Sequence, residues 1–320
     1  MQHFIDWLKK PVRDSIFLYW ELLKVMVPIM VIVRLGVEFG LIDHISLMFT
    51  PFMDVVGLPP EAGIIWTTAM LVNIYAGMVT LVALLPEAPM SVAQITVLGS
   101  MILIAHSLPI EQRIVQKAGP SLIATTLLRI VGALVYGAIL NLIYQGFQVL
   151  QENATIDWLP STAVDAGWLQ WTQDSAISLF SIFWVILVLI LALKILEALK
   201  VTDFISKGLA PVLGLMGISK HAIPVTMIGV MLGLGYGGAL IIREAKEGKM
   251  SSQDIFLSLS FMCLFHSMIE DTLLIFALGA DLSGILIGRF IFSFIILFFM
   301  GLLVKKMPKQ AFDRLLFKQT

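Results

Sequence analysis

The sequence predicts an all-α, polytopic membrane helix bundle built from two internally repeated halves. Hydrophobic residues form 58% of the 320-residue chain and charged residues only 13%, proportions that exclude an ordinary soluble domain. Residues 43–57 also resemble residues 203–217, so the second half restates the first at an offset of 160 positions. Internal duplication of a membrane chain is typical of secondary transporters, whose substrate sites lie between the halves near the bilayer midplane.

Polar residues support the repeat best, because matches of Leu, Ile and Val arise by chance in an apolar chain. The same offset aligns Gly77 with Gly237, Ser91 with Ser251, His106-Ser107 with His266-Ser267, Gly119 with Gly279 and Arg129 with Arg289. Histidine occurs only five times in the chain, so a matched His-Ser pair is informative. We therefore expect a first repeat at 14–150, an acidic linker containing tryptophans at 151–173, and a second repeat at 174–310.

Each repeat begins with a long helix, predicted at 14–40 and 174–200, followed by a short amphipathic piece. That piece opens with Asp43 or Asp203 as a helix N-cap and carries a proline, Pro51 or Pro211. A long apolar helix, a segment centred on His-Ser and a final helix follow. Several uncharged stretches approach the roughly 20 residues that cross hydrocarbon as a helix. They are residues 62–85, 88–110, 130–150, 175–193 and 222–242.

Basic residues near the ends of spans predict the orientation, because they are retained on the cytoplasmic side. Lys9, Lys10 and Arg13 place the N-terminus in the cytoplasm, basic residues after 304 place the C-terminus there, and the linker lacks Lys and Arg. We expect an inner-membrane protein with two inverted halves, each with three crossings and a re-entrant hairpin centred on His-Ser. The alternative is four crossings in each half. It would place Arg243 on the cytoplasmic side, but it would place the acidic linker there as well.

Both copies of the His-Ser motif precede carboxylates, Glu111 in the first repeat and Glu270 with Asp271 in the second. Residues four apart on a helix are neighbours, so His266 and Glu270 should share a face. Pro109 should break the first segment near His106. Ionisable groups inside a membrane segment indicate a functional site by default. In the plainer interpretation these groups only brace helix packing, but their surplus of donors and acceptors favours a ligand site or a proton path.

The glycine-rich stretch at 233–239 (GLGYGGA) either permits close helix packing or unwinds beside a substrate, with Asn73, Tyr75 and Gly77 as its counterpart. The candidate substrate-binding residues are therefore His106, Ser107, Glu111, Gln112, His266, Ser267, Glu270, Asp271, Asn73 and Tyr236.

Two arginines, Arg129 and Arg289, begin the last crossing of each repeat. Each pairs with a carboxylate or an anionic ligand, or extends to the nearest interface. The 21 uncharged residues after Arg129 favour the interface for it, whereas the shorter apolar run after Arg289 favours burial.

Metal binding is left open by the sequence. Cys263, His266 and Glu270 are spaced for one helix face, and with His106 and Glu111 could supply soft and hard ligands. Metalloprotease, paired-cysteine and nucleophile-elbow motifs are missing, so we expect neither an enzyme nor a cofactor. A net charge of −1 gives no reason to expect a nucleic-acid partner.

An apolar, glycine-bearing helix followed by HSLPIEQ (106–112) or HSMIEDT (266–272) resembles the nucleoside-recognition, or Gate, domain of multi-pass membrane proteins. The resemblance covers residues 57–145 and 217–304. The same domain type occurs in spore maturation proteins, in the membrane part of the ferrous iron transporter B and in concentrative nucleoside transporters. It implies a transport-type bundle with paired hairpins. The glutamine-threonine-glutamate hairpin of nucleoside transporters and the GTPase portion of the iron transporter are missing here.

These observations predict a secondary transporter or permease for a small polar solute, such as a nucleoside-like compound or an ion, with proton coupling through the His and carboxylate pairs. The alternative is a non-transporting membrane scaffold or regulatory subunit that docks a partner protein. The expected partners are the lipid bilayer, the solute or ion, and either a second copy of the chain or a membrane protein.

Overall fold

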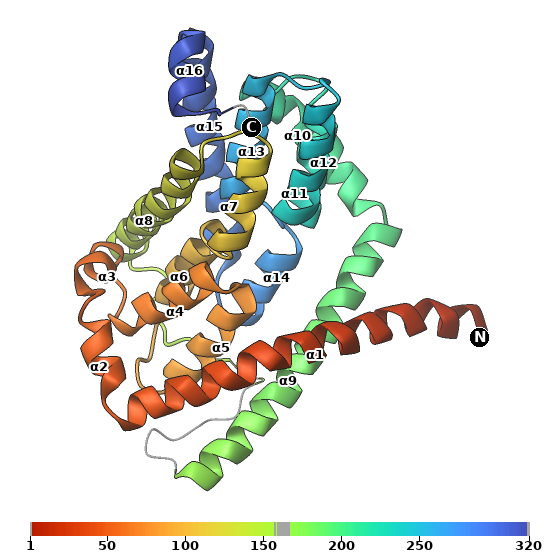
Figure 1. Ribbon diagram of the computed structural model, residues 1–320. Coiled ribbons are helices and arrows are strands. Elements are labelled where there is room, and N and C mark those ends of the chain that lie inside the picture. Colours follow the sequence, from red (N-terminus) through yellow and green to blue (C-terminus); the bar gives the residue numbers. More distant parts are fainter. Residues whose placement is uncertain (1, 157, 159–166, 319–320) are drawn as a thin grey trace.

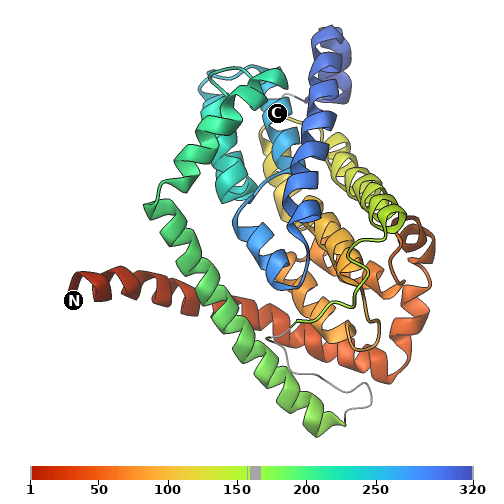
Figure 2. The same ribbon diagram turned by 180° about the vertical axis from the view of Figure 1, so that it is seen from behind.

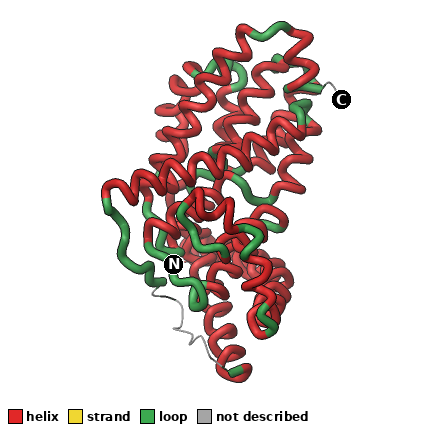
Figure 3. Tube along the Cα trace, turned by 90° about the vertical axis from the view of Figure 1, so that its left-hand side faces the viewer, coloured by secondary structure: helices red, strands yellow, loops and turns green. Residues whose placement is uncertain are grey.

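The described part of the chain is helical throughout, with no strand assigned in it. The structure is a computed structural model that describes residues 2–156, 158 and 167–318. Figure 3 shows helices joined by short loops over these residues. The all-α prediction is confirmed. Of the residues that predicted the orientation, the side chains of Lys9 and Lys10 lie outside the described residues.

The first half consists of a long helix, two short helices, a helical hairpin, a helix broken near its middle and a final long helix (Figure 1). They are α1 (Gln2–Glu38), α2 (Leu41–Ser46), α3 (Thr50–Val56), α4 (Glu61–Leu71), α5 (Ile74–Leu84), α6 (Val92–Ile104), α7 (Leu108–Lys117) and α8 (Leu122–Phe147).

The second half repeats this order with three differences: one helix stands where the first half has two short ones, a π-helical turn (η1) precedes the last long helix, and a short helix follows it. Its elements are α9 (Trp168–Ala198), α10 (Val201–Leu215), α11 (Ile223–Leu232), α12 (Leu234–Lys246), α13 (Ser252–Leu264), α14 (Glu270–Ala277), η1 (Ser283–Gly288), α15 (Arg289–Lys306) and α16 (Lys309–Leu315).

Five segments within the described residues are long and apolar enough to cross a membrane. They are Pro11–Glu38, Val92–Lys117, Leu122–Phe147, Trp168–Ala198 and Ser283–Lys306. The second of these joins α6 and α7 across their break and is mostly buried. In α8 and α15 large apolar side chains such as Ile123, Leu142 and Phe299 remain exposed, as lipid-facing positions require.

The re-entrant hairpins lie one element earlier than predicted. The stretch at 62–85 is two antiparallel helices, α4 and α5, and a Cβ added to Gly77 of α5 would lie 2.6 Å from the Cβ of Ala69 in α4. The second half repeats this: a Cβ on Gly237 would lie 2.3 Å from the Cα of Gly229. The matched glycines therefore let the two arms of each hairpin touch. The prediction of a hairpin at His-Ser was wrong, since each of those segments is a helix broken at the motif, and Val92–Lys117 is long and apolar enough to cross a membrane.

The two broken crossings run antiparallel. The backbone N–H of Asp281, just after α14, donates to Thr96 in the first turns of α6, over 2.8 Å. Near the two breaks, Gln112 of α7 contacts Cys263 in the last turn of α13. The end of one broken helix thus lies beside the start of the other, which is the arrangement that inverted halves predict.

Two contacts join residues that are 160 positions apart, the offset of the sequence repeat. The Tyr19 hydroxyl donates to the carbonyl of Leu179 where α1 crosses α9, a crossing that Figure 2 shows from behind. His106 and His266 form the second pair. A residue that touches its own counterpart lies on a twofold axis. These contacts support the predicted duplication.

The amphipathic pieces begin differently from the prediction. Asp43 and Asp203 lie in the first turns of α2 and α10, while Gly40 and Lys200 occupy the N-cap positions in the left-handed region. Pro51 starts a separate helix, α3, whereas Pro211 lies inside α10. In the linker, residues 157 and 159–166 lie outside the described residues, and α9 already begins at Trp168.

Substitution of Gly237 tests the hairpin. Gly237→Ala places a methyl group against the backbone of Gly229, which cannot move without separating α11 from α12. We therefore expect the free energy of unfolding to fall by about 1–3 kcal/mol. Gly235→Ala, in the same helix, meets no described heavy atom within 4 Å and should leave the melting temperature in detergent unchanged or raise it. Equal melting temperatures for the two variants would contradict the close approach.

Candidate functional site

The site is built where the two crossing helices stop in the middle of the bundle. Helix α6 ends at Ile104 and α13 at Leu264, and the serine three positions later in each half has a positive φ, 50° at Ser107 and 47° at Ser267. Pro109 begins α7, but the second half breaks at the equivalent place with no proline. Proline is therefore not the common cause of the break.

The tips of the hairpins satisfy the backbone at both breaks. The N–H of Ser107 donates to the carbonyl of Ala69 in α4 over 3.0 Å, and the N–H of Met268 donates to the carbonyl of Val230 in α11 over 2.9 Å. A buried backbone donor without a partner is costly, and in lipid it has no water to turn to. Each re-entrant hairpin thus holds the break of the neighbouring crossing helix in place.

Arg129 binds the free carbonyl ends of the first break. Its Nε donates to the carbonyl of Ile104 over 2.7 Å, one Nη donates to the carbonyl of His106 over 2.8 Å, and the other pairs with Glu111. The side chain is fully buried. The expectation that Arg129 extends to the interface was wrong, because two carbonyls freed by the helix break and the carboxylate of Glu111 hold it inside.

Arg289 occupies the equivalent place with fewer partners. One Nη donates to the carbonyl of His266 over 3.3 Å, and the guanidinium lies 4.7 Å from the ring centre of Phe265. Its Nε and other Nη have no hydrogen-bond partner among the described residues. Position 271, the counterpart of Glu111, holds an aspartate. Its side chain is one methylene shorter, and no contact of hydrogen-bond length joins it to Arg289 in the described structure.

The two histidines face each other between the breaks. Nδ1 of His106 lies 2.9 Å from the carbonyl oxygen of Ile102, and Nδ1 of His266 lies 2.7 Å from that of Met262. A carbonyl only accepts, so each ring carries its proton on Nδ1 and presents a lone pair at Nε2. The two Nε2 atoms are 3.3 Å apart, and both rings are buried.

Carboxylates approach the same two nitrogens from the opposite halves. Asp271 Oδ2 lies 3.6 Å from Nε2 of His106, and Glu111 Oε1 lies 3.4 Å from Nε2 of His266 and 3.7 Å from that of His106. The predicted pairing of His266 with Glu270 was wrong, because the chain between them is not helical. We call His106, His266, Glu111 and Asp271 the acceptor cluster.

Other predicted residues support the cluster without joining it. The Gln112 side chain accepts from Thr125 over 2.7 Å and contacts the Sγ of Cys263, which ties α7 to α8 and α13. Asn73 caps α5 by accepting from the N–H of Ala76. The Ser267 hydroxyl accepts weakly from the N–H of Asp271, over 3.4 Å.

Tyr236 and Glu270 lie away from the cluster. The Tyr236 side chain is 71% exposed, so the structure does not bring this candidate substrate-binding residue together with the cluster. Glu270 accepts from the hydroxyl of Tyr75 over 3.5 Å, a contact across the halves that the sequence could not predict.

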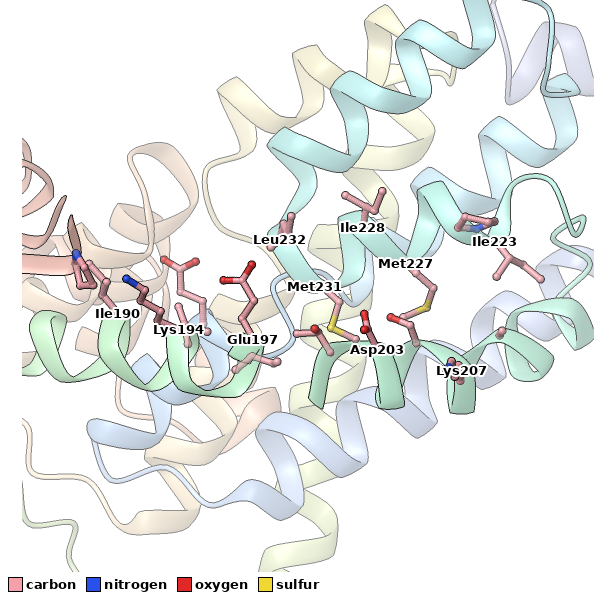
Figure 4. Close-up of a pocket in the computed structure, with 18 residues that line it drawn as sticks. Ile190, Lys194, Glu197, Asp203, Lys207, Ile223, Met227, Ile228, Met231 and Leu232 are labelled. Atoms are coloured by element: carbon pink, nitrogen blue, oxygen red, sulfur yellow. The ribbon is translucent and has the colours of Figure 1, made fainter. Parts of the chain in front are cut away.

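Glu270 also lines a groove of about 840 Å³ between α9, α10, α11 and the start of α14 (Figure 4). One wall carries charged side chains, among them Lys194, Glu197 and Asp203. The opposite wall is apolar, with Met227 and Met231 of α11. The residues that line this groove include Glu270 but none of the four residues of the acceptor cluster.

Comparison with known proteins supports a membrane location. The chain is 26% identical over 275 residues to a Bacillus subtilis (strain 168) protein named uncharacterized membrane protein YvoD, and the alignment covers 84% of this chain and 86% of that protein. No protein-family model and no solved structure matches the chain. With five helices able to span a bilayer, this similarity identifies the chain as a multi-pass membrane protein.

The unequal arginines give a paired test. Arg129→Met leaves Glu111 and two carbonyls of the break without their buried partner, so we expect a loss of about 3–5 kcal/mol. Arg289→Met removes one long hydrogen bond and two unpartnered donors, so it should lower the free energy of unfolding by only about 1 kcal/mol. Thermal melts of both variants in one detergent measure the difference. Equal losses would contradict the assignment of Arg129 as the brace.

Proposed function

We propose that this membrane protein is a permease that carries a small polar solute or ion across the bilayer, with the acceptor cluster as its binding site. One observation carries the proposal: four acceptor groups, two from each antiparallel half and three of them buried, converge where the helices break. Groups that only brace a fold pair donors with acceptors. Here acceptors face acceptors, which leaves a place for a cation or for a ligand that donates hydrogen bonds.

The architecture around the cluster supports the same function. Non-helical backbone at membrane depth is tolerated where it is buried in protein or lines a cavity, and here it occurs at matched positions of both halves. Discontinuous helices that meet at the centre of inverted repeats are a recurrent design of secondary transporters. The resemblance to Gate domains implies transport as well. The inner-membrane location with both termini in the cytoplasm belongs to this proposal and rests on the distribution of Lys and Arg.

Proton coupling follows from the chemistry of the two imidazoles. With Nδ1 bonded to a carbonyl, each ring can take up a proton only at Nε2, the atom that faces the cluster. A proton there would turn an acceptor into a donor and satisfy the facing carboxylate. A proton and a bound solute or ion therefore compete for the same atoms, which is sufficient to couple their movements.

Transport is tested with the double variant His106→Gln and His266→Gln in proteoliposomes that contain a pH-sensitive dye. Uridine, adenosine, Mn²⁺ and Zn²⁺ are added in turn across an imposed proton gradient. We expect the wild type to couple proton movement to at least one of them, and the double variant to lose that response because both protonation sites are gone. His221→Gln, which removes an exposed imidazole outside the cluster, is the matched control.

The scaffold alternative predicts a different result for the same variants. If the histidines only brace the fold, the double variant melts well below the wild type in detergent, and the wild-type liposomes show no proton movement with any solute. A wild-type response that survives in the double variant would show transport through another site and overturn the assignment of the cluster.

A further inference from the structure

Three side chains of the cluster have spacings that fit a metal ion, and the fourth, Glu111, lies beside both imidazoles. Side chains of His106, His266 and Asp271 offer ligand atoms that all lie within 4.8 Å of one another, and all three residues are buried. Glu111 Oε1 lies 3.4 Å from one imidazole nitrogen and 3.7 Å from the other. A tetrahedral ion with bonds of about 2.0–2.1 Å separates its ligands by about 3.3–3.4 Å. The distance between the two Nε2 atoms, 3.3 Å, matches this edge.

We propose that the cargo of this permease is a divalent transition-metal ion, bound by Nε2 of His106, Nε2 of His266 and the carboxylates of Asp271 and Glu111. This inference rests on the proposed transport function and names its substrate class. Two imidazoles with two carboxylates suit Zn²⁺, Fe²⁺, Co²⁺ or Mn²⁺, whereas Mg²⁺ and Ca²⁺ prefer oxygen ligands alone.

The surroundings of the imidazoles favour a metal over an organic solute. Each ring donates its Nδ1 proton to a backbone carbonyl, the second-shell contact that fixes a ligating histidine with its lone pair on the ion. Neighbouring atoms of the cluster are 3.3–3.7 Å apart, and the ligand atoms of His106, His266 and Asp271 all lie within 4.8 Å of one another, spacings that suit a single ion better than a sugar or a base. Cys263 does not belong to the ligand set, because its Sγ faces Gln112.

The charge balance suits a transported ion rather than a permanent one. Arg129 pairs with Glu111, and buried Arg289 lies in the same half as Asp271, so two arginines offset the two carboxylates. The neutral imidazoles add no charge. An ion would be attracted by ligand lone pairs more than by net charge, and a site that releases its ion must not hold it too tightly.

Metal binding is measured on the full chain in detergent, purified with a tag that contains no histidine and treated with a chelator. Calorimetric titration with Zn²⁺ and absorption titration with Co²⁺ should each show one saturable site per chain. His106→Gln, His266→Gln and Asp271→Asn should each weaken affinity by about tenfold or more, and His221→Gln should leave it unchanged. X-ray absorption of the wild-type Zn²⁺ complex should show nitrogen and oxygen ligands at about 2.0–2.2 Å and no sulfur.

Several results would overturn the inference. They are the lack of a saturable site in the wild type, equal affinity in the cluster variants and the wild type, or a sulfur ligand. Asp271→Asn keeps the size of the side chain, so it tests the site if a histidine variant fails to fold. Transport of an organic solute without metal binding would contradict the proposal that the cargo is a metal ion, while the proposal that the protein is a permease would hold. Metal binding at the cluster without flux in proteoliposomes would leave the site standing and refute the permease.

Discussion

The structure depends on satisfying the backbone where two membrane helices stop in the middle of a hydrophobic bundle. The polar groups freed at each break have no water to bind, so protein must supply every partner. Carbonyls of the hairpin tips, at Ala69 and Val230, accept the free N–H groups, and the guanidinium of Arg129 takes up the free carbonyls of the first break. The hairpins and the buried arginines follow from this requirement. So does the close packing of the two arms within each hairpin, at Gly77 in the first half and at Gly237 in the second.

Sequence reasoning predicted the helical class and the break at His106, and it singled out the two His-Ser motifs, whose histidines the structure places face to face. It placed the re-entrant hairpins one element too late, because hydrophobicity along 62–85 is continuous and does not reveal a turn. Asn73 was a usable signal: a good N-cap inside an apolar stretch marks the start of a new helix, and its side chain caps α5. The contact between His266 and Glu111 joins positions far apart in the chain, so no local pattern could predict it.

The halves are equivalent in backbone and unequal in chemistry. Ser107 and Ser267 share a positive φ, and both histidines bond the carbonyl four residues earlier. The difference is one methylene group: Glu111 reaches its arginine and Asp271 does not. A near-symmetric site therefore has one carboxylate fixed by an ion pair and one without such a tie. The shared geometry is what the predicted duplication would give, and the shorter side chain explains why Arg289 keeps donors without a partner among the described residues.

The bonds from Nδ1 of each histidine to the carbonyls of Ile102 and Met262 attach each imidazole to the last turn of its own helix. The ring cannot turn without giving up that bond, and the helix cannot lengthen or unravel by a residue without carrying the ring along. The binding of a ligand between the two rings is therefore coupled to the winding of α6 and α13. A change at the end of either helix would widen or narrow the gap between the rings as directly as a ligand would.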